Sequence, residues 1–288
     1  MTIREALKKG TDMLEYVEIE TPVLEAGVIL SFVLGCDRAY IYSHGDKFIG
    51  ENETNKFFAL IEERSRGKPT QYITGFQEFM SLRFEVNQHV LIPRPETEIL
   101  VEKIIEYVKE NYTGRVNILD IGTGSGCISV SLAYYLPDSH ITAVDISWEA
   151  LEVAKRNAEN AGVENRVKFI QSDLFSQLPL LQGNMKYDII VSNPPYIPSL
   201  DLTSLQLEVR GYEPLKALDG GDDGLYFYRR IIKGSLDFLK PGGLLAFEVG
   251  YNQAQLVCDL MKECFSEVEI IKDLAKVDRV VTGKLKCM

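Results

Sequence analysis

The chain has 288 residues, a length typical of about two domains that each bury a core of their own. Hydrophobic residues make up 45% of the chain and charged residues 25%, which excludes a disordered chain, a collagen and a small disulfide scaffold. The net charge of -11 at pH 7 has the wrong sign for a protein that wraps a nucleic-acid backbone over a broad surface.

Neither a membrane span nor a metal site is expected from the sequence. The longest apolar uncharged stretch, Ala26 to Cys36, is shorter than the ~20 residues that a membrane-spanning helix needs. Met1 to Gly10 lacks the apolar core of a signal peptide. From the absence of both features we expect a cytoplasmic location. The five cysteines form no C-x-x-C pair and only three histidines are present, so we expect reduced thiols and no structural zinc.

The first part of the chain has helical patterns. Thr21 precedes Pro22 as an N-cap and starts a nearly all-apolar helix, which we expect in the middle of a small bundle. A second helix is predicted from Asn55 to Arg66. It ends in a basic cluster that we expect to be a solvated helix end, since cations suit the helix dipole there. The cluster comprises Arg64, Arg66 and Lys68.

Between Tyr72 and Ile92 the apolar period changes to two, which predicts a β-hairpin. We therefore expect a helical domain over 1–72, a hairpin linker over 73–95 and a larger domain over 96–288. From Pro95 onward helix and strand patterns alternate, as in a parallel sheet covered by helices on both sides. The predicted strands are Asn117–Ile121, Ile141–Asp145, Val167–Gln171, Tyr187–Val191, Leu244–Val249, Val268–Lys272 and Arg279–Gly283.

A glycine-rich turn, 122–126, follows the first of these strands and leads into a helix. Its alternating glycines allow a ligand to approach the backbone closely at the carboxyl end of the strand. Asp145 ends the next strand, about 20 residues later, where a carboxylate can accept hydrogen bonds from a ribose. Asp173 and Leu174 follow the third strand and would contact an adenine. The G-x-G-x-G spacing, with Asp120 two positions ahead, resembles S-adenosylmethionine-dependent methyltransferases rather than dehydrogenases.

The sequence Asn193-Pro194-Pro195-Tyr196 follows the fourth strand. A conjugated amino group, in an amide or an adenine, is a poor nucleophile because its lone pair is delocalised. The Asn193 side-chain oxygen and the Pro194 main-chain oxygen can accept its two N–H bonds and orient the nitrogen towards a methyl group. Proline keeps both acceptors rigid, and Tyr196 can pack on the planar substrate group.

Taken together, these motifs resemble the release factor glutamine methyltransferase (HemK/PrmC) family. The resemblance implies a Rossmann-like, seven-stranded class I methyltransferase domain behind a helical domain that binds the substrate. A departure from the family pattern is Lys276, where similar proteins usually have glycine. The matching stretches are Ile92–Glu98, the glycine turn, Asn193–Pro198, Tyr212–Pro214, Ala217–Gly221 and Glu248–Gly250.

The resemblance also implies the reaction and its participants. S-adenosylmethionine would give its methyl group to N5 of the glutamine in the Gly-Gly-Gln motif of a peptide chain release factor, leaving S-adenosylhomocysteine, with no metal. Asn193 to Tyr196 would hold the glutamine. Arg94 would bind substrate or form a buried salt bridge, and Glu248 would be structural. The implied donor contacts are Asp120, Gly122, Thr123, Gly124, Ser125, Gly126, Asp145, Asp173, Leu174 and Asn193.

Three other functions share some of these features. Adenine-N6 methyltransferases of DNA or RNA face the same nucleophile problem, but they need a basic channel, which the net charge disfavours. A glutamine of a ribosomal protein is an acceptor that the same chemistry permits. A non-catalytic interaction protein is disfavoured by the intact donor and acceptor motifs. We therefore expect no membrane partner and no stable nucleic-acid binding.

Overall fold

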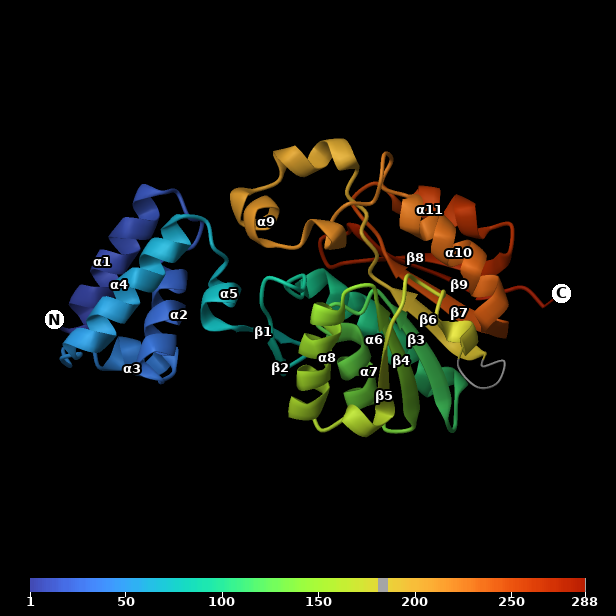
Figure 1. Ribbon diagram of the computed structural model, residues 1–288, viewed down its shortest axis with the longest axis horizontal. Helices are drawn as coiled ribbons and strands as arrows, with labels where there is room; N and C mark the ends of the chain where they lie inside the picture. Colours follow the sequence, from blue (N-terminus) through green and yellow to red (C-terminus); the bar gives the residue numbers. More distant parts are fainter. Residues whose placement is uncertain (181–185, 288) are drawn as a thin grey trace. The chain divides into compact units, whose positions relative to one another are not determined.

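The computed structural model describes residues 1–180 and 186–287 (Figure 1). The chain divides into two compact units. One consists of Met1–Phe76 together with Gln206–Tyr212, and the other of Gln77–Leu205 together with Glu213–Met288. Across the described residues no helix is both long and apolar enough to cross a membrane.

The first unit is a helical bundle whose core comes mainly from α1, α2 and α4. Gly10 of α1 lies against Phe57 of α4 so closely that an added Cβ would come within 2.6 Å of the ring, which keeps these two helices in tight contact. The helices are α1 (Ile3–Tyr16), α2 (Pro22–Leu34), α3 (Arg38–Ser43), α4 (Glu51–Ser65), α5 (Thr70–Thr74) and α9 (Leu207–Tyr212).

Helix α2 begins at Pro22 as predicted, but the Thr21 side chain makes no capping hydrogen bond. The apolar helix also packs on one face only. Ile29 and Leu30 are buried, whereas Val23 and Leu24 remain exposed.

The expected solvated end of α4 is wrong for Arg64. Its side chain is buried and forms ion pairs with Glu25 of α2 and Glu208 of α9. The physical reason is its position on the helix. Arg64 comes seven residues after Phe57 and three after Ile61, so its side chain lies on the same buried face of α4 as theirs.

The predicted hairpin is present at the start of the second unit, as β1 (Phe76–Phe79) and β2 (Leu82–Glu85). Met80 and Ser81 form its turn, both with positive φ. A two-residue turn of this kind matches the twist of the paired strands. Phe84 is buried in a core that it shares with the main sheet, so the hairpin is packed on this unit.

The main sheet has seven strands in the order β5-β4-β3-β6-β7-β9-β8. Strands β3 to β7 run parallel, as predicted, and β9 runs antiparallel to both of its neighbours. A short turn joins β8 to β9, which requires antiparallel pairing. The strands are β3 (Val116–Ile121), β4 (Ser139–Asp145), β5 (Val167–Gln171), β6 (Tyr187–Ser192), β7 (Leu239–Glu248), β8 (Phe265–Lys272) and β9 (Asp278–Leu285).

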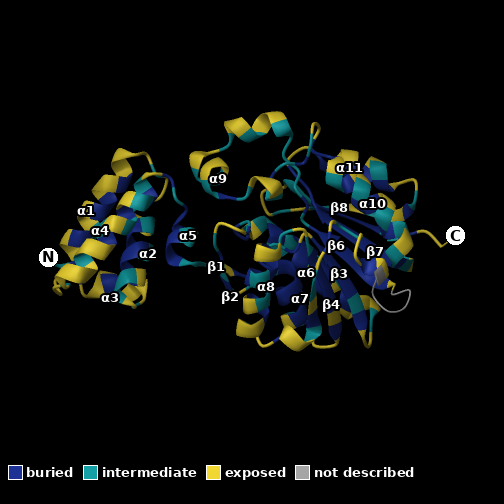
Figure 2. Ribbon diagram, in the orientation of Figure 1, coloured by how far each residue is buried: buried dark blue, intermediate teal, exposed yellow. Residues whose placement is uncertain are grey.

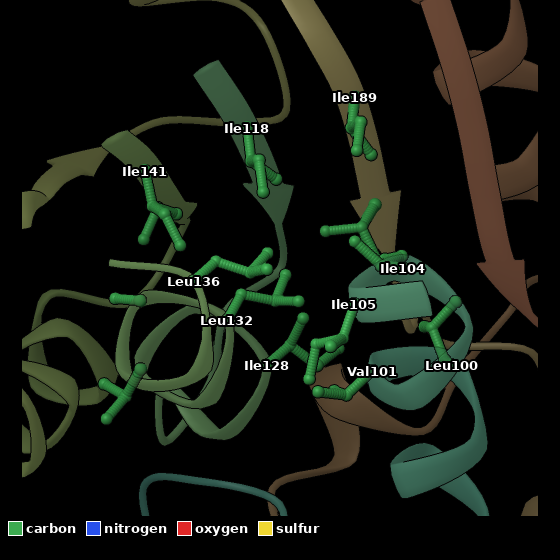
Figure 3. Close-up of a cluster of buried hydrophobic side chains, with 14 of the residues drawn as sticks. Leu100, Val101, Ile104, Ile105, Ile118, Ile128, Leu132, Leu136, Ile141 and Ile189 are labelled. Carbon is green, nitrogen blue, oxygen red and sulfur yellow. The ribbon is translucent and has the colours of Figure 1, made fainter. Parts of the chain in front are cut away.

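Helices cover both faces of this sheet, which confirms the predicted α/β class. Consecutive residues of β3 point to opposite faces, and Ile118 and Leu119 belong to separate apolar cores. Figure 3 shows Ile118 among side chains of α6 and α7, and Figure 2 shows the strands buried between partly exposed helices. The helices are α6 (Pro95–Asn111), α7 (Cys127–Tyr135) and α8 (Trp148–Asn160) on one face, and α10 (Tyr226–Phe238) and α11 (Ala254–Met261) on the other.

Four short 3-10 helices complete the described secondary structure: η1 (Glu164–Arg166), η2 (Leu178–Leu180), η3 (Ser199–Ser204) and η4 (Leu215–Ala217).

Candidate active site

The glycine turn lies between β3 and α7, at the carboxyl edge of the sheet. Gly122, Gly124 and Gly126 all have positive φ, a conformation that favours glycine. A Cβ on Gly122 or Gly124 would meet no other atom within 4 Å, so open space lies beside the turn. A Cβ on Gly126 would lie 3.0 Å from Ala154 of α8. Two of the glycines therefore border space for a ligand, and the third allows close packing of α8.

Asp120 lies in β3 immediately before the turn and is fully buried. Its Oδ2 accepts a hydrogen bond from the Thr123 hydroxyl at 2.6 Å. Its Oδ1 is also buried and has no hydrogen-bond partner among the described residues. Burial raises the pKa of this carboxyl to about 7. A buried carboxylate oxygen without a partner is rare and is suited to a donor group of a bound ligand.

Asp145 ends β4 beside the same turn. Its carboxylate accepts hydrogen bonds from the backbone N–H groups of Gly124 and Ser147, each at 2.9 Å. Burial raises its pKa. The structure therefore brings Asp145 and the glycine turn together, as the sequence predicts.

Asp173 and Leu174 follow β5 at the same edge of the sheet. The Asp173 carboxylate forms an ion pair with Arg230 of α10 at 3.0 Å. Leu174 has a positive φ and is partly buried. Neither Ser125 nor Thr123 is exposed, so the turn offers a ligand its backbone rather than these side chains.

The Asn193-Pro194-Pro195-Tyr196 segment begins where β6 ends, beside β3. Ile121 and Ser192 are paired in the sheet, and the Ser192 hydroxyl donates to the Ile121 carbonyl at 2.7 Å. Gly122 and Asn193 are therefore the first residues after two paired, parallel strands, and they lie at the same edge of the sheet. This register places the predicted acceptor segment next to the predicted donor turn.

A loop from 217 to 224 holds the far end of this segment. A Cβ on Gly220 would lie 2.7 Å from Cα of Tyr196, and one on Gly224 would lie 2.4 Å from the Tyr196 carbonyl oxygen. The Gln253 side chain donates to the same oxygen at 2.8 Å. Burial raises the pKa of Tyr196, so its hydroxyl is neutral. Only glycine can occupy positions 220 and 224 at these distances. The loop and Gln253 together hold the backbone of Tyr196 in place.

Asn193 itself contacts two residues to which the sequence assigned no role in catalysis. Its Nδ2 donates to the Thr97 hydroxyl of α6 at 3.2 Å, and that hydroxyl donates to Glu248 of β7 at 2.5 Å. In the sequence, Thr97 is 96 positions from Asn193, and Glu248 is 151 positions from Thr97. The only sequence signal for them is that both fall inside stretches that match the family.

Arg94, just before α6, forms an ion pair with Glu213. The Glu213 side chain is 2% exposed and also accepts from the Ile92 backbone N–H at 3.3 Å. The structure thus contains the salt bridge that was one of the two expectations for Arg94. No cluster of three or more side chains able to hold a metal ion occurs in the described part of the chain.

The chain matches two family models, the PrmC N-terminal domain over residues 5–75 and the methyltransferase small domain over residues 96–206. It is 42% identical over 282 residues to the release factor glutamine methyltransferase of Clostridium acetobutylicum, with 98% of each chain covered. The chain belongs to the release factor glutamine methyltransferase family.

Two solved structures are also similar. A release factor-specific protein-(glutamine-N5) methyltransferase of Alicyclobacillus acidocaldarius is 32% identical, covers 71% of this chain and all of its own, and has a TM-score of 0.43. A methyltransferase of Pyrococcus furiosus is 20% identical, covers 73% of this chain and 91% of its own, and has a TM-score of 0.51. The second supports the methyltransferase fold. Membership of the glutamine methyltransferase family confirms the resemblance inferred from the sequence.

Proposed function

We propose that the protein transfers a methyl group from S-adenosylmethionine to the side-chain amide nitrogen, N5, of the glutamine in the Gly-Gly-Gln motif of peptide chain release factors. The observation that carries this proposal is full-length similarity to release factor glutamine methyltransferases, combined with an Asn-Pro-Pro-Tyr segment beside an open glycine turn. Because release factors act at the ribosome, the proposal places the protein in the cytoplasm.

The donor would lie over the glycine turn. When bound, it supplies an electrophilic methyl group on a positively charged sulfur. Asp145 would accept hydrogen bonds from the ribose hydroxyls, since its carboxylate lies beside the Gly124 backbone. The unpartnered oxygen of Asp120 fits a cationic amino group. The residues assigned to the donor are Asp120, Gly122, Thr123, Gly124, Ser125, Gly126, Asp145, Asp173, Leu174 and Asn193.

The acceptor amide would be held by Asn193 and Pro194. The Asn193 side-chain oxygen and the Pro194 carbonyl oxygen accept its two N–H bonds and aim the nitrogen at the methyl group. Pro195 restricts the backbone, and Tyr196 packs against the planar carboxamide. In the transfer, the nitrogen would bond to the methyl carbon while the carbon–sulfur bond breaks and S-adenosylhomocysteine leaves. The extra proton on the nitrogen is released afterwards, so no side-chain base is required.

The partner is proposed to be a protein rather than a nucleic acid. The net charge of -11 does not provide the broad basic surface that tight nucleic-acid binding uses. Residues 5–75 match the N-terminal domain model of this enzyme family, and we assign substrate binding to this helical unit. Arg94 forms an ion pair with Glu213. We assign it to holding the start of α6 in place rather than to contact with the substrate.

The test is methylation with labelled S-adenosylmethionine. The protein is incubated with a bacterial release factor and, separately, with the same factor carrying Gly-Gly-Ala in place of Gly-Gly-Gln. We expect label in the first factor only, located on the glutamine by mass spectrometry. Equal labelling of both factors, or labelling of ribosomal protein, RNA or DNA in preference to the first factor, would contradict the proposal.

A further inference from the structure

A buried chain of three side chains leads away from Asn193. Asn193 Nδ2 contacts Thr97 Oγ1 at 3.2 Å, and Thr97 Oγ1 contacts Glu248 Oε2 at 2.5 Å. Thr97 is 2% exposed and Glu248 3% exposed, so bulk water does not compete for these bonds. The chain joins α6, the end of β6 and the end of β7, which all belong to the same unit.

The direction of these hydrogen bonds determines how the Asn193 amide is turned. An ionised carboxylate accepts hydrogen bonds and donates none, so the single hydrogen of the Thr97 hydroxyl is directed to Glu248. The Thr97 oxygen can then only accept. The end of the Asn193 amide that faces it must be the NH₂ group, which turns the carbonyl oxygen Oδ1 away from Thr97.

We propose that Thr97 and Glu248 are positioning residues that hold the Asn193 amide with its oxygen available to the acceptor glutamine. The inference rests on the proposed function, in which that oxygen accepts an N–H bond from the substrate. Without the chain, the Asn193 amide could rotate by half a turn and present an NH₂ group, which would repel the N–H groups of the glutamine.

The proposal has a consequence for pH. Burial raises the pKa of Glu248 to about 7, although the hydrogen bond from Thr97 opposes the rise. A protonated Glu248 can donate to Thr97, whose own hydrogen is then free to point at Asn193 and reverse the amide. Lowering the pH through this range should therefore reduce turnover. The charged and titratable groups that act on Glu248 from the surrounding elements are Glu96, Arg279, Tyr196, Tyr228 and Cys127.

The decisive comparison is Thr97→Val against Thr97→Ser in the full-length protein, with a release factor as acceptor. Valine has nearly the shape of threonine but lacks the hydroxyl, whereas serine keeps it. We expect Thr97→Val to lower kcat by about tenfold or more and Thr97→Ser to stay within about threefold of the wild type. The Kd for S-adenosylmethionine should be the same in all three proteins. Equal kcat values for the two variants would overturn the inference.

A second variant covers the possibility that Thr97→Val does not fold. Glu248→Gln keeps an oxygen that accepts from Thr97 but does not titrate. We expect kcat of this variant to fall less at acid pH than kcat of the wild type. Superimposable pH profiles would overturn the positioning role. If the wild type itself does not label the release factor glutamine, the proposed function fails, whereas normal wild-type labelling with unaffected variants refutes this inference alone.

Discussion

Asn193 is assigned to both the methyl-donor site and the acceptor-glutamine site. If its side-chain oxygen orients the glutamine, Asn193→Ala should reduce kcat by about 100-fold, which corresponds to roughly 3 kcal/mol of lost transition-state stabilisation. The glycine turn does not depend on this side chain, so the Kd for S-adenosylmethionine should remain measurable by calorimetry. Turnover equal to that of the wild type would remove Asn193 from its assigned role.

Asp120 should make the stability of the donor-free protein depend on pH. Its pKa is about 7 in the folded protein, above the unfolded value of 3.8, because burial disfavours the charged form. The folded state therefore binds more protons between these two values, and the contribution of Asp120 to stability falls as pH rises through that window.

The variant Asp120→Asn keeps an oxygen for the Thr123 hydroxyl and removes the titration. Urea unfolding of the second unit, followed at its single tryptophan, Trp148, should show that the variant gains stability relative to the wild type between about pH 5 and about pH 8, by on the order of 1 kcal/mol or more. A difference between the two proteins that stays constant over this range would show that Asp120 does not titrate as described. Because Glu248 titrates in both proteins, its effect cancels in the comparison.

At this scale the sequence predicted local geometry better than distant contacts. The place of the glycine turn at the end of β3 and the position of Asp145 followed from residue types and strand ends. The link from Thr97 to Glu248 could not be predicted, because hydrogen bonds over 151 positions depend on the order of strands in the sheet. Lys276 has a φ of 64°, which explains why a glycine would suit that turn.

Among the elements, α4 depends on the buried charge of Arg64. Its guanidinium pairs with Glu25, whose side chain is 17% exposed, and also with Glu208. Thr70 donates to Glu25 as well, at 2.5 Å. Removal of Arg64 would leave the Glu25 carboxylate largely buried without its cation, which is costly.

We expect Arg64→Ala to destabilise the helical unit by about 3 kcal/mol. Glu208→Gln is the matched control, because its side chain is more exposed and should cost about 1 kcal/mol or less. Since a chain with two units need not unfold in one step, hydrogen exchange measured in α2 and α4 is the suitable readout. Equal protection of these helices in the two variants would contradict the assigned importance of the pair.

Element types were predictable where the apolar pattern was long. The predicted limits of β5 agree with the structure, whereas β7 begins five residues earlier than predicted. Its first residue follows α10 directly, so no turn residues separate helix from strand. Helix α9 was not predicted, because six residues are too few to show a helical period.

For the whole molecule, the alternation of strands and helices was sufficient to predict the α/β class and the placement of ligand-binding residues at one edge of the sheet. It was not sufficient to predict strand order, since β6 pairs with β3 although two strands lie between them in sequence. Nor did composition reveal that 206–212 groups with the first unit, since contacts rather than residue types define that grouping.

Helix α9 limits how this enzyme could be recombined with its relatives. The helical unit is not one continuous N-terminal block, because it includes a short segment encoded between Asn193 and Glu213. Leu207 in that segment lies against Gly67, where an added Cβ would come within 3.0 Å. A chimera exchanging only the first 76 residues would join a foreign bundle to a native α9. A transplant of the helical unit between family members therefore requires residues 1–76 and 206–212 to be exchanged together.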